Sequence, residues 1–313
     1  MASGLLVWLL LHFRIALDAP NDRSLHEEPT PRAGGLGLLA GAFLGILISV
    51  GFGMPVLWIA LGLAILSLID DRGHLPVAIR LTGHMFAAAL FVASISENFN
   101  LFLFLPLVIG IAWAINLYNF MDGSDGLAGG MTVFGFGTYA VAAGLQGHND
   151  IGLLSLAIAA AAGGFLIFNF PPARIFMGDV GSISIGFLAA AIGLQGWYEG
   201  VWPVLFPVVV FAPFAVDATV TLFRRALRRE RVWKAHREHY YQRLILSGWS
   251  HRRVALAAYV LMLASALAGG IVVFAGVTGK VAAITTLALL FAVSMTMINR
   301  RSYLSRQEKG VTR

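Results

Sequence analysis

Apolar residues form long, nearly uninterrupted stretches along the whole chain, separated by short polar segments. A helix needs about 20 mostly apolar residues to cross the hydrocarbon core of a bilayer. Eleven stretches reach or approach that length: 4–17, 35–53, 54–69, 81–95, 101–118, 126–146, 151–170, 182–197, 201–222, 253–276 and 279–299. The pattern predicts an all-α, polytopic integral membrane protein with about 10–11 transmembrane helices, built as a single transmembrane domain over residues 1–313.

The first stretch is short, because Arg14 and Asp18 close it. A cleaved signal is the alternative, but no small-residue cleavage site of the A-x-A kind follows it. We therefore expect a tilted or truncated first helix.

The composition agrees with a lipid environment. The chain is 58% hydrophobic and only 12% charged, about half the charged fraction of an average soluble protein. The absence of cysteine excludes disulfides, thiolate nucleophiles and Cys-ligated zinc. A net charge of +6 would suggest nucleic-acid binding in a soluble protein. In a membrane protein it is better explained by the basic residues that collect in cytoplasmic loops.

Basic residues set the orientation of the predicted helices. With the N-terminus outside, 21 of the 22 Lys and Arg residues fall inside or at inner helix ends, and only Lys280 falls outside. The positive-inside rule therefore predicts an external N-terminus and a cytoplasmic C-terminus. The cytoplasmic segments are then 18–34, 70–80, 119–125, 171–181 and 223–252, with the tail 300–313.

Acidic residues gather on the same side. Thirteen of the 16 Asp and Glu residues lie at the cytoplasmic face or its border, and only Glu97, Asp150 and Glu199 lie outside. A transporter would carry carboxylates near the middle of its spans. Here Asp217 is the only other acid inside a span, and it lies near the inner end. The distribution favours an acidic site on the cytoplasmic face over a transport pathway.

The second and third loops supply hard oxygen ligands. Asp70 and Asp71 are adjacent at the end of an apolar stretch, where two carboxylates repel each other unless a cation or a function holds them. Asn119, Asp122 and Asp125 follow at intervals of three, among glycines, and oxygen donors of this kind suit Mg²⁺. Part of a calcium loop has similar spacing, but it would need a Glu at its twelfth position. Two solvent-facing acids and a structural Asx turn are the plainer interpretations.

The first loop is a stiff connection or merely the end of a helix, and the fourth loop suits an anion. The first, 23–35, contains two prolines and ends in a glycine pair, which predicts an extended connection and a tight turn into the next helix. In the fourth, Gly178 and Gly181 bracket Asp179, and we expect Ser182 to cap the following helix. Free backbone N–H groups at that helix start would attract an anion, with a carboxylate beside them for its metal.

The fifth loop is strongly basic. The run 224–231 is equally well explained as an electrostatic anchor to anionic lipid. His236 and His239 would share one face if that segment were helical, in a cationic setting suited to a diphosphate. A zinc site is the alternative, but no third ligand lies nearby in the sequence.

Taken together, these five loops resemble those of the polyprenyl-phosphate N-acetylhexosamine-1-phosphate transferase family. That family includes the phospho-MurNAc-pentapeptide translocase of peptidoglycan synthesis and the bacterial enzymes that begin O-antigen, enterobacterial common antigen and teichoic acid linkage units. The matching segments occur in family order: 26–35 (HEEPTPRAGG), 70–71 (DD), 116–126 (NLYNFMDGSDG), 176–182 (FMGDVGS) and 236–239 (HREH).

The resemblance implies a reaction. A membrane polyprenyl phosphate attacks the sugar-linked phosphorus of a UDP-N-acetylhexosamine, which gives a polyprenyl diphosphate sugar and UMP and requires Mg²⁺, with Mn²⁺ as a substitute. The implied partners are undecaprenyl phosphate, the UDP-sugar and the bilayer of a bacterial inner membrane, without nucleic acid, and a homodimer is left open. The enzyme would initiate a cell-surface polysaccharide such as the O-antigen of lipopolysaccharide.

The same resemblance implies residue roles. Asp179 and Asn119 would hold Mg²⁺, Asp70 would lie near the lipid phosphate as a candidate base, and Asp71 would support it. Direct displacement is favoured over an aspartyl-phosphate intermediate. The residues expected to contact substrate are Asp122 and Asp125 at the nucleotide, Phe176 at uracil, His236, Arg237 and His239 at the diphosphate or sugar, and Arg80 at the lipid phosphate.

Some positions depart from the family pattern. Peptidoglycan translocases have three consecutive histidines where this chain has segment 236–239. That difference favours UDP-GlcNAc, or a 6-deoxy relative such as UDP-FucNAc or UDP-QuiNAc, and leaves UDP-MurNAc-pentapeptide as the alternative. His84 stands where a Gln is common, and Arg80 where a Lys is common.

Overall fold

The structure is a computed structural model that describes residues 2–12, 17–18, 30–51, 53–73, 75–95, 101–232, 234 and 236–308. The start of the first-loop motif, with His26, lies outside these residues. The elements are α1 (Ala2–His12), β1 (Leu17–Asp18), β2 (Thr30–Pro31), α2 (Gly34–Ser49), α3 (Pro55–Gly73), α4 (Val77–Ile95), α5 (Leu101–Met121), α6 (Leu127–Leu145), α7 (Asn149–Asn169), α8 (Gly178–Tyr198), α9 (Leu205–Val210), α10 (Ala212–Leu227), α11 (Tyr240–Leu246), α12 (His251–Phe274) and α13 (Val277–Glu308).

The prediction of an all-α, polytopic membrane protein is confirmed. Each of the eleven predicted stretches overlaps a helix. Within the described chain, seven helices are long and apolar enough to cross a membrane. They are α4, α5, α6, α7, α8, α12 and α13. The number of crossings in the bilayer remains a prediction.

The predicted loops are wider than the observed connections. α3 runs on to Gly73 and α4 begins at Val77, so little of the predicted loop 70–80 is left. α10 continues to Leu227, and α11 (Tyr240–Leu246) is a helix that was not predicted. α13 extends through most of the predicted tail, to Glu308.

The ninth predicted span, 201–222, is broken rather than continuous. α9 ends at Val210 and α10 begins at Ala212, with Phe211 between them. Pro213 has no N–H to donate, and its ring collides with the carbonyl four residues earlier in a straight helix. In the first turn of a new helix the missing N–H does no harm, and Pro213 occupies such a position in α10.

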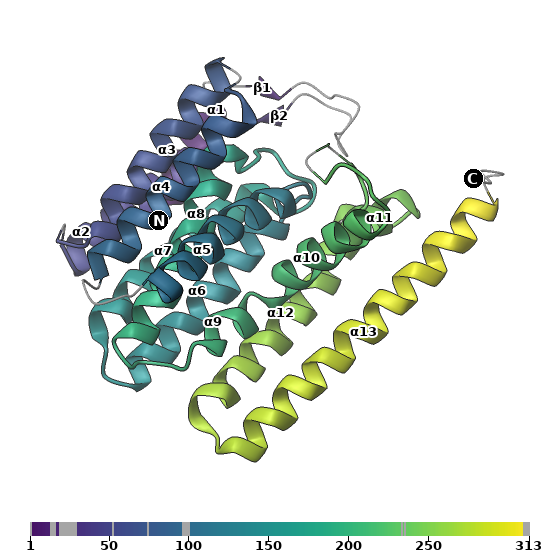
Figure 1. Cartoon of the computed structure of the whole chain (residues 1–313). Coiled ribbons are helices and arrows are strands. Elements are labelled where there is room, and N and C mark those ends of the chain that lie inside the picture. Colours follow the sequence, from purple (N-terminus) through teal and green to yellow (C-terminus); the bar gives the residue numbers. More distant parts are fainter. Residues whose placement is uncertain are drawn as a thin grey trace.

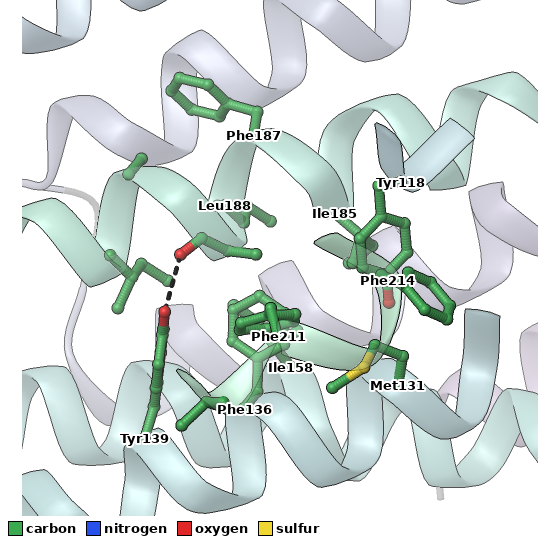
Figure 2. Close-up of a cluster of buried hydrophobic side chains, with 14 of the residues drawn as sticks. Tyr118, Met131, Phe136, Tyr139, Ile158, Ile185, Phe187, Leu188, Phe211 and Phe214 are labelled. Atoms are coloured by element: carbon green, nitrogen blue, oxygen red, sulfur yellow. Dashed lines mark hydrogen bonds between the residues drawn. The ribbon is translucent and has the colours of Figure 1, made fainter. Parts of the chain in front are cut away.

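α8 lies at the centre of the bundle, and most of its side chains are buried among the surrounding helices. Figure 2 shows Phe187 of α8 and the aromatic side chains of neighbouring elements, among them Tyr118, Phe136, Tyr139 and Phe211. The Tyr139 hydroxyl donates a hydrogen bond of 3.1 Å to the Ala189 carbonyl. Such internal pairing is needed because lipid offers a buried polar group no partner.

α13 lies at the margin of the molecule, next to α12 (Figure 1, yellow). Leu289, Val293 and Met297 are among its exposed side chains. An exposed apolar face of this length is compatible with contact with lipid acyl chains. By contrast, the end of α13 beyond Ile298 is polar and begins with Asn299-Arg300-Arg301.

The first loop is joined to the fourth by backbone hydrogen bonds. The N–H groups of Gly34 and Gly35 donate to the carbonyls of Phe176 and Met177, at 3.0 and 2.9 Å, and the Phe176 N–H donates to the Pro31 carbonyl at 2.8 Å. A Cβ atom on Gly35 would lie 2.5 Å from the Gly181 nitrogen. The glycines therefore let the starts of α2 and α8 meet backbone to backbone, which fixes the position of Asp179.

Candidate active site

Asp179 lies in the first turn of α8, and its Oδ1 atom accepts hydrogen bonds from the first loop and from the end of α5. The donors are Arg32 Nη2 at 3.3 Å and Asn119 Nδ2 at 3.2 Å. Asn119 Nδ2 also lies 3.0 Å from Ser182 Oγ. Ser182 is buried inside α8 and does not cap it, so the predicted cap was wrong. α8 begins one turn earlier, at Gly178, because that residue adopts a φ of +71° at which the chain can turn sharply.

Asp122 meets the same helix start. The Gly178 N–H donates to its carboxylate. Burial raises the pKa of Asp122 well above its usual range; the charge of Arg32 opposes that shift, and the nearby charge of Asp179 adds to it. One of the backbone N–H groups predicted to attract an anion, that of Gly178, is therefore already bound to a carboxylate of the protein. Two acids that repel each other at close range create a local demand for positive charge.

Asp70 and Asp71 have different surroundings. Asp70 is buried, and its two oxygens accept hydrogen bonds from the Leu75 N–H at 2.7 Å and from Arg80 Nη1 at 3.1 Å. Asp71 is exposed at the end of α3. The repulsion expected between adjacent carboxylates is therefore relieved by a cation and a backbone donor on Asp70.

His84 connects the second loop to Asp179. It is buried on α4, and its Nδ1 atom lies 3.3 Å from Asn116 Nδ2. Its ring interacts electrostatically with Arg80, Asp179 and Asp70. The structure thus brings together the acidic cluster, which consists of Asp70, Asn119, Asp122 and Asp179 with Arg32 and Arg80.

Segment 236–239 is not helical, contrary to the condition on which the shared face was predicted. The two imidazoles nevertheless lie close together, with ring centroids 4.9 Å apart. Burial, followed by the charges of His239 and Arg225, lowers the pKa of His236 to about 4. His236 is therefore neutral at pH 7, and Arg237 is the arginine of this segment.

His239 is held by Asp217, which the sequence analysis did not include among the site residues. Its Nδ1 atom lies 3.2 Å from Asp217 Oδ1. Asp217 also accepts hydrogen bonds from the N–H groups of Tyr240 at 2.9 Å and Tyr241 at 3.2 Å. Because a carboxylate only accepts, His239 Nδ1 carries the proton. The sequence does contain a signal for this contact, because Asp217 is an acid inside a predicted span and the loop that follows carries His239.

Aromatic contacts connect this segment to the third loop. The His239 ring stacks on Phe120 and on Tyr241, with centroids 6.1 and 6.0 Å apart. The Tyr241 hydroxyl donates to the Phe120 carbonyl at 3.1 Å. Phe120 lies between Asn119 and Met121, so the histidine segment borders the acidic cluster.

Asp125 links the third loop to the fourth loop and to the start of α12. Its Oδ2 accepts from the Ala173 N–H at 2.9 Å, and its Oδ1 lies 3.5 Å from His251 Nδ1. The adjacent Gly126 N–H donates to Asn169 Oδ1 at 3.0 Å. His251 and Asn169 were not predicted as site residues. The nucleotide contacts predicted for Asp122 and Asp125 remain predictions.

The remaining predicted residues lie nearby. Phe176 is half-buried, and its backbone is held by the first loop. Arg237 is also half-buried. Glu238, between Arg237 and His239, forms ion pairs with Arg225 and Arg228.

The acidic cluster offers donors that fit Mg²⁺. In the part of the chain that the structure describes, no three His, Asp or Glu side chains converge closely enough to enclose a metal alone. Mg²⁺ does not require such a cage, since it usually binds one or two carboxylates, keeps waters and shares substrate phosphates. Asp179 has a carboxylate and Asn119 an amide oxygen, both hard donors of this kind, although here it is the amide nitrogen of Asn119 that contacts Asp179. The mutual repulsion of Asp179 and Asp122 favours a cation between the loops.

The chain is similar in sequence to a known family and to several named transferases. A model of glycosyl transferase family 4 matches residues 54–196. The chain is 32% identical to the probable undecaprenyl-phosphate N-acetylglucosaminyl 1-phosphate transferase of Bacillus subtilis (strain 168), over 79% of this chain and 74% of the relative. It is 28% identical to the decaprenyl-phosphate N-acetylglucosaminephosphotransferase of Mycolicibacterium smegmatis, over 95% and 84% of the two chains. It is 31% identical to the phospho-N-acetylmuramoyl-pentapeptide-transferase of Halalkalibacterium halodurans, over 77% and 82%.

These similarities extend over the loops that form the acidic cluster, because the family model includes Asp70, Asn119, Asp122 and Asp179. They agree with the resemblance found in the order of the sequence motifs. The chain therefore belongs to glycosyl transferase family 4, the polyprenyl-phosphate N-acetylhexosamine-1-phosphate transferases.

Proposed function

We propose that this protein transfers the sugar-1-phosphate of a UDP-N-acetylhexosamine to undecaprenyl phosphate in a bacterial inner membrane. The observation that carries the proposal is the meeting of the acidic cluster and the histidine segment at the ends of apolar helices. One substrate is a lipid and the other a soluble nucleotide, so a site at the helix ends is accessible to both. The relatives named as polyprenyl-phosphate aminosugar phosphotransferases support the same reaction.

The chemistry is a direct displacement at phosphorus. An oxygen of the acceptor phosphate bonds to the sugar-linked phosphorus, and the bond from that phosphorus to the bridging oxygen breaks. UMP leaves with the electron pair. The acceptor phosphate is already anionic at pH 7, so the protein mainly has to position the reactants and balance their charge.

The side chains divide this work. Asp179 and Asn119 would hold Mg²⁺, which neutralises charge on the diphosphate when bound. Asp70 orients Arg80 towards the lipid phosphate, and Asp71 supports it from the exposed side of the helix end. Asp217 fixes His239 with its proton on Nδ1, which leaves Nε2 for the diphosphate or sugar. Asp122, Asp125 and Phe176 form the nucleotide side of the site.

For the sugar, we propose N-acetylglucosamine or a 6-deoxy relative. Two of the relatives described above are named for N-acetylglucosamine. Segment 236–239 also lacks the three consecutive histidines of the peptidoglycan enzymes. A relative named for N-acetylmuramoyl-pentapeptide keeps that sugar as the second candidate. The product would be the first lipid-linked intermediate of a cell-surface polysaccharide, made on the cytoplasmic face.

A substrate-resolved assay tests the proposal. The purified protein is incubated with undecaprenyl phosphate, Mg²⁺ and one UDP-sugar at a time, and mass spectrometry follows the lipid product and UMP. We expect one UMP for each polyprenyl diphosphate N-acetylglucosamine, and no product when EDTA removes the metal. A product from UDP-MurNAc-pentapeptide alone would overturn the sugar assignment. No UMP from any UDP-sugar would overturn the activity.

A further inference from the structure

A polar pocket of about 320 Å³ lies between α10, α11 and the polar end of α13. Its volume is within the usual range for small-molecule sites. The lining includes Arg224, Arg228, Glu238, Arg243 and Asn299. Three arginines and one glutamate give it an excess of positive charge.

Two of the arginines converge on one neutral amide. Arg224 Nη1 lies 3.2 Å and Arg243 Nη1 lies 2.7 Å from the same oxygen, Asn299 Oδ1. Arg224 Nη1 also donates to the Tyr240 hydroxyl at 2.8 Å. Arg228 forms ion pairs with Glu230 and Glu238. Two guanidinium groups gathered around a neutral acceptor offer paired donors to an anion, an arrangement that matches phosphate geometry.

The pocket is separate from the acidic cluster. Alternate residues of one short segment face different ways: Glu238 and Tyr240 line the pocket, whereas the buried His239 contacts Asp217 and Phe120. The backbone N–H of Tyr240 is also bound to Asp217. A phosphate in the pocket would therefore lie across this segment from the reacting groups.

The pocket also lies where lipid headgroups are expected. α13 is apolar up to Ile298 and becomes polar at Asn299, which lines the pocket. On α10, Phe223 and Leu227 are exposed next to Arg224 and Arg228. An apolar surface beside a basic pocket suits a ligand with acyl chains below and a phosphate above. Figure 1 shows α13 at the open margin of the bundle, where lipid has access.

We propose that this pocket binds the phosphate group of an anionic membrane phospholipid. The site is distinct from that of the acceptor lipid, and the proposal does not depend on the proposed function. The bound headgroup would fasten the end of α13 to α10 and α11, directly behind the segment that carries His239.

The test measures lipid binding by the purified full chain. Native mass spectrometry compares dioleoyl phosphatidylglycerol with zwitterionic dioleoyl phosphatidylcholine, and inorganic phosphate serves as a soluble competitor. We expect phosphatidylglycerol to bind in preference. Arg224→Gln/Arg243→Gln should weaken this binding by about tenfold or more, because two charge-assisted contacts are lost. The control Arg231→Gln/Arg252→Gln removes the same charge from exposed positions outside the pocket and should leave binding unchanged.

A second variant keeps the test decisive if the double variant fails to fold. Asn299→Asp is nearly isosteric and places a carboxylate between the two arginines. It should keep or raise the thermal stability, yet weaken phosphatidylglycerol binding about tenfold or more because the anion site is already neutralised. The proposal is overturned if phosphatidylcholine binds equally well, or if Asn299→Asp binds phosphatidylglycerol as the parent does. If inorganic phosphate displaces the lipid at equal concentration, the pocket is a soluble-phosphate site and the lipid assignment fails.

Discussion

Replacing Asp217 by Asn tests how His239 is positioned. Asp217 is only 7% exposed, so water cannot replace a lost partner. Its Oδ1 atom accepts from His239 Nδ1, the Tyr240 N–H and the Thr221 hydroxyl, and its Oδ2 atom accepts from the Tyr241 N–H. An Asn can keep its amide oxygen at the Oδ1 position. Its NH₂ group then faces the Tyr241 N–H, so that two donors oppose each other.

The expected loss of stability follows from these contacts. A hydrogen bond to a charged group contributes about 1.5–3 kcal/mol, and a buried donor left without a partner costs about 1–3 kcal/mol. Asp217→Asn loses one such bond outright and weakens the others, so we expect it to lower the free energy of unfolding by about 3 kcal/mol. Thr221→Val removes one hydroxyl donor from the same carboxylate and leaves His239 in place. It should lower the free energy of unfolding by about 1 kcal/mol.

Two measurements on the purified variants separate positioning from stability. Unfolding in detergent, followed by tryptophan fluorescence, gives the stability difference. Product formation, measured at a temperature where both variants are folded, should fall much further for Asp217→Asn than for Thr221→Val, because a neutral amide oxygen holds the Nδ1–H group of His239 more weakly than the carboxylate does. If the two variants lose equal stability and equal activity, Asp217 does not position His239 and the reasoning is refuted.

Four further predictions use other contacts. Asp179→Asn should abolish turnover and the Mg²⁺-dependent part of UDP-sugar binding, since an amide is a neutral and poorer Mg²⁺ ligand. Asp70→Asn should slow turnover but keep the Mg²⁺-dependent part of UDP-sugar binding. Calorimetry that shows the reverse would exchange the roles of the two acids. His236 has a pKa of about 4, against 6.5 as the ordinary value, so the unfolded chain takes up the proton first and stability should fall as the pH drops from 6.5 towards 4. His236→Gln should flatten that fall in thermal melts, and parallel curves would contradict it. Gly35→Ala should destabilise the protein by about 1–3 kcal/mol, because its Cβ would lie 2.5 Å from a backbone nitrogen; an unchanged melting temperature would contradict the close helix contact. A cysteine at Ser305 should react with an impermeant maleimide only in inside-out vesicles, and labelling of intact cells would invert the topology.

Much of the fold could be predicted because lipid imposes simple constraints. Every backbone group in the hydrocarbon must find an internal partner, so a long apolar stretch predicts a helix wherever it occurs. The meeting of the loops could also be predicted, since the charge pattern places Asn119 and Asp179 on the same face, where the two side chains are in contact. Charge asymmetry and motif order carried that inference.

Other features depend on contacts that the sequence does not display. Ser182 has the residue type of a cap, yet α8 begins at Gly178 because the first loop and Asp122 bind the turn that precedes it. Pro213 accompanies the break at Phe211, because it starts a new helix there. Pro106, by contrast, lies inside the continuous helix α5. Composition alone could not distinguish these two prolines.

The burial of each acid indicates its role in the site. Asp70 and Asp217 are buried, and their oxygens accept hydrogen bonds from other groups of the protein. Asp70 binds the side chain of Arg80, and Asp217 binds the side chain of His239. A buried carboxylate without such partners would be costly, so these two acids cannot readily change ligands during a reaction. Asp179 is different, because its side chain is 21% exposed and Arg32 and Asn119 both contact its Oδ1 atom. We therefore propose that the buried acids Asp70 and Asp217 position other groups, and that Asp179 is the acid that meets a metal and a diphosphate.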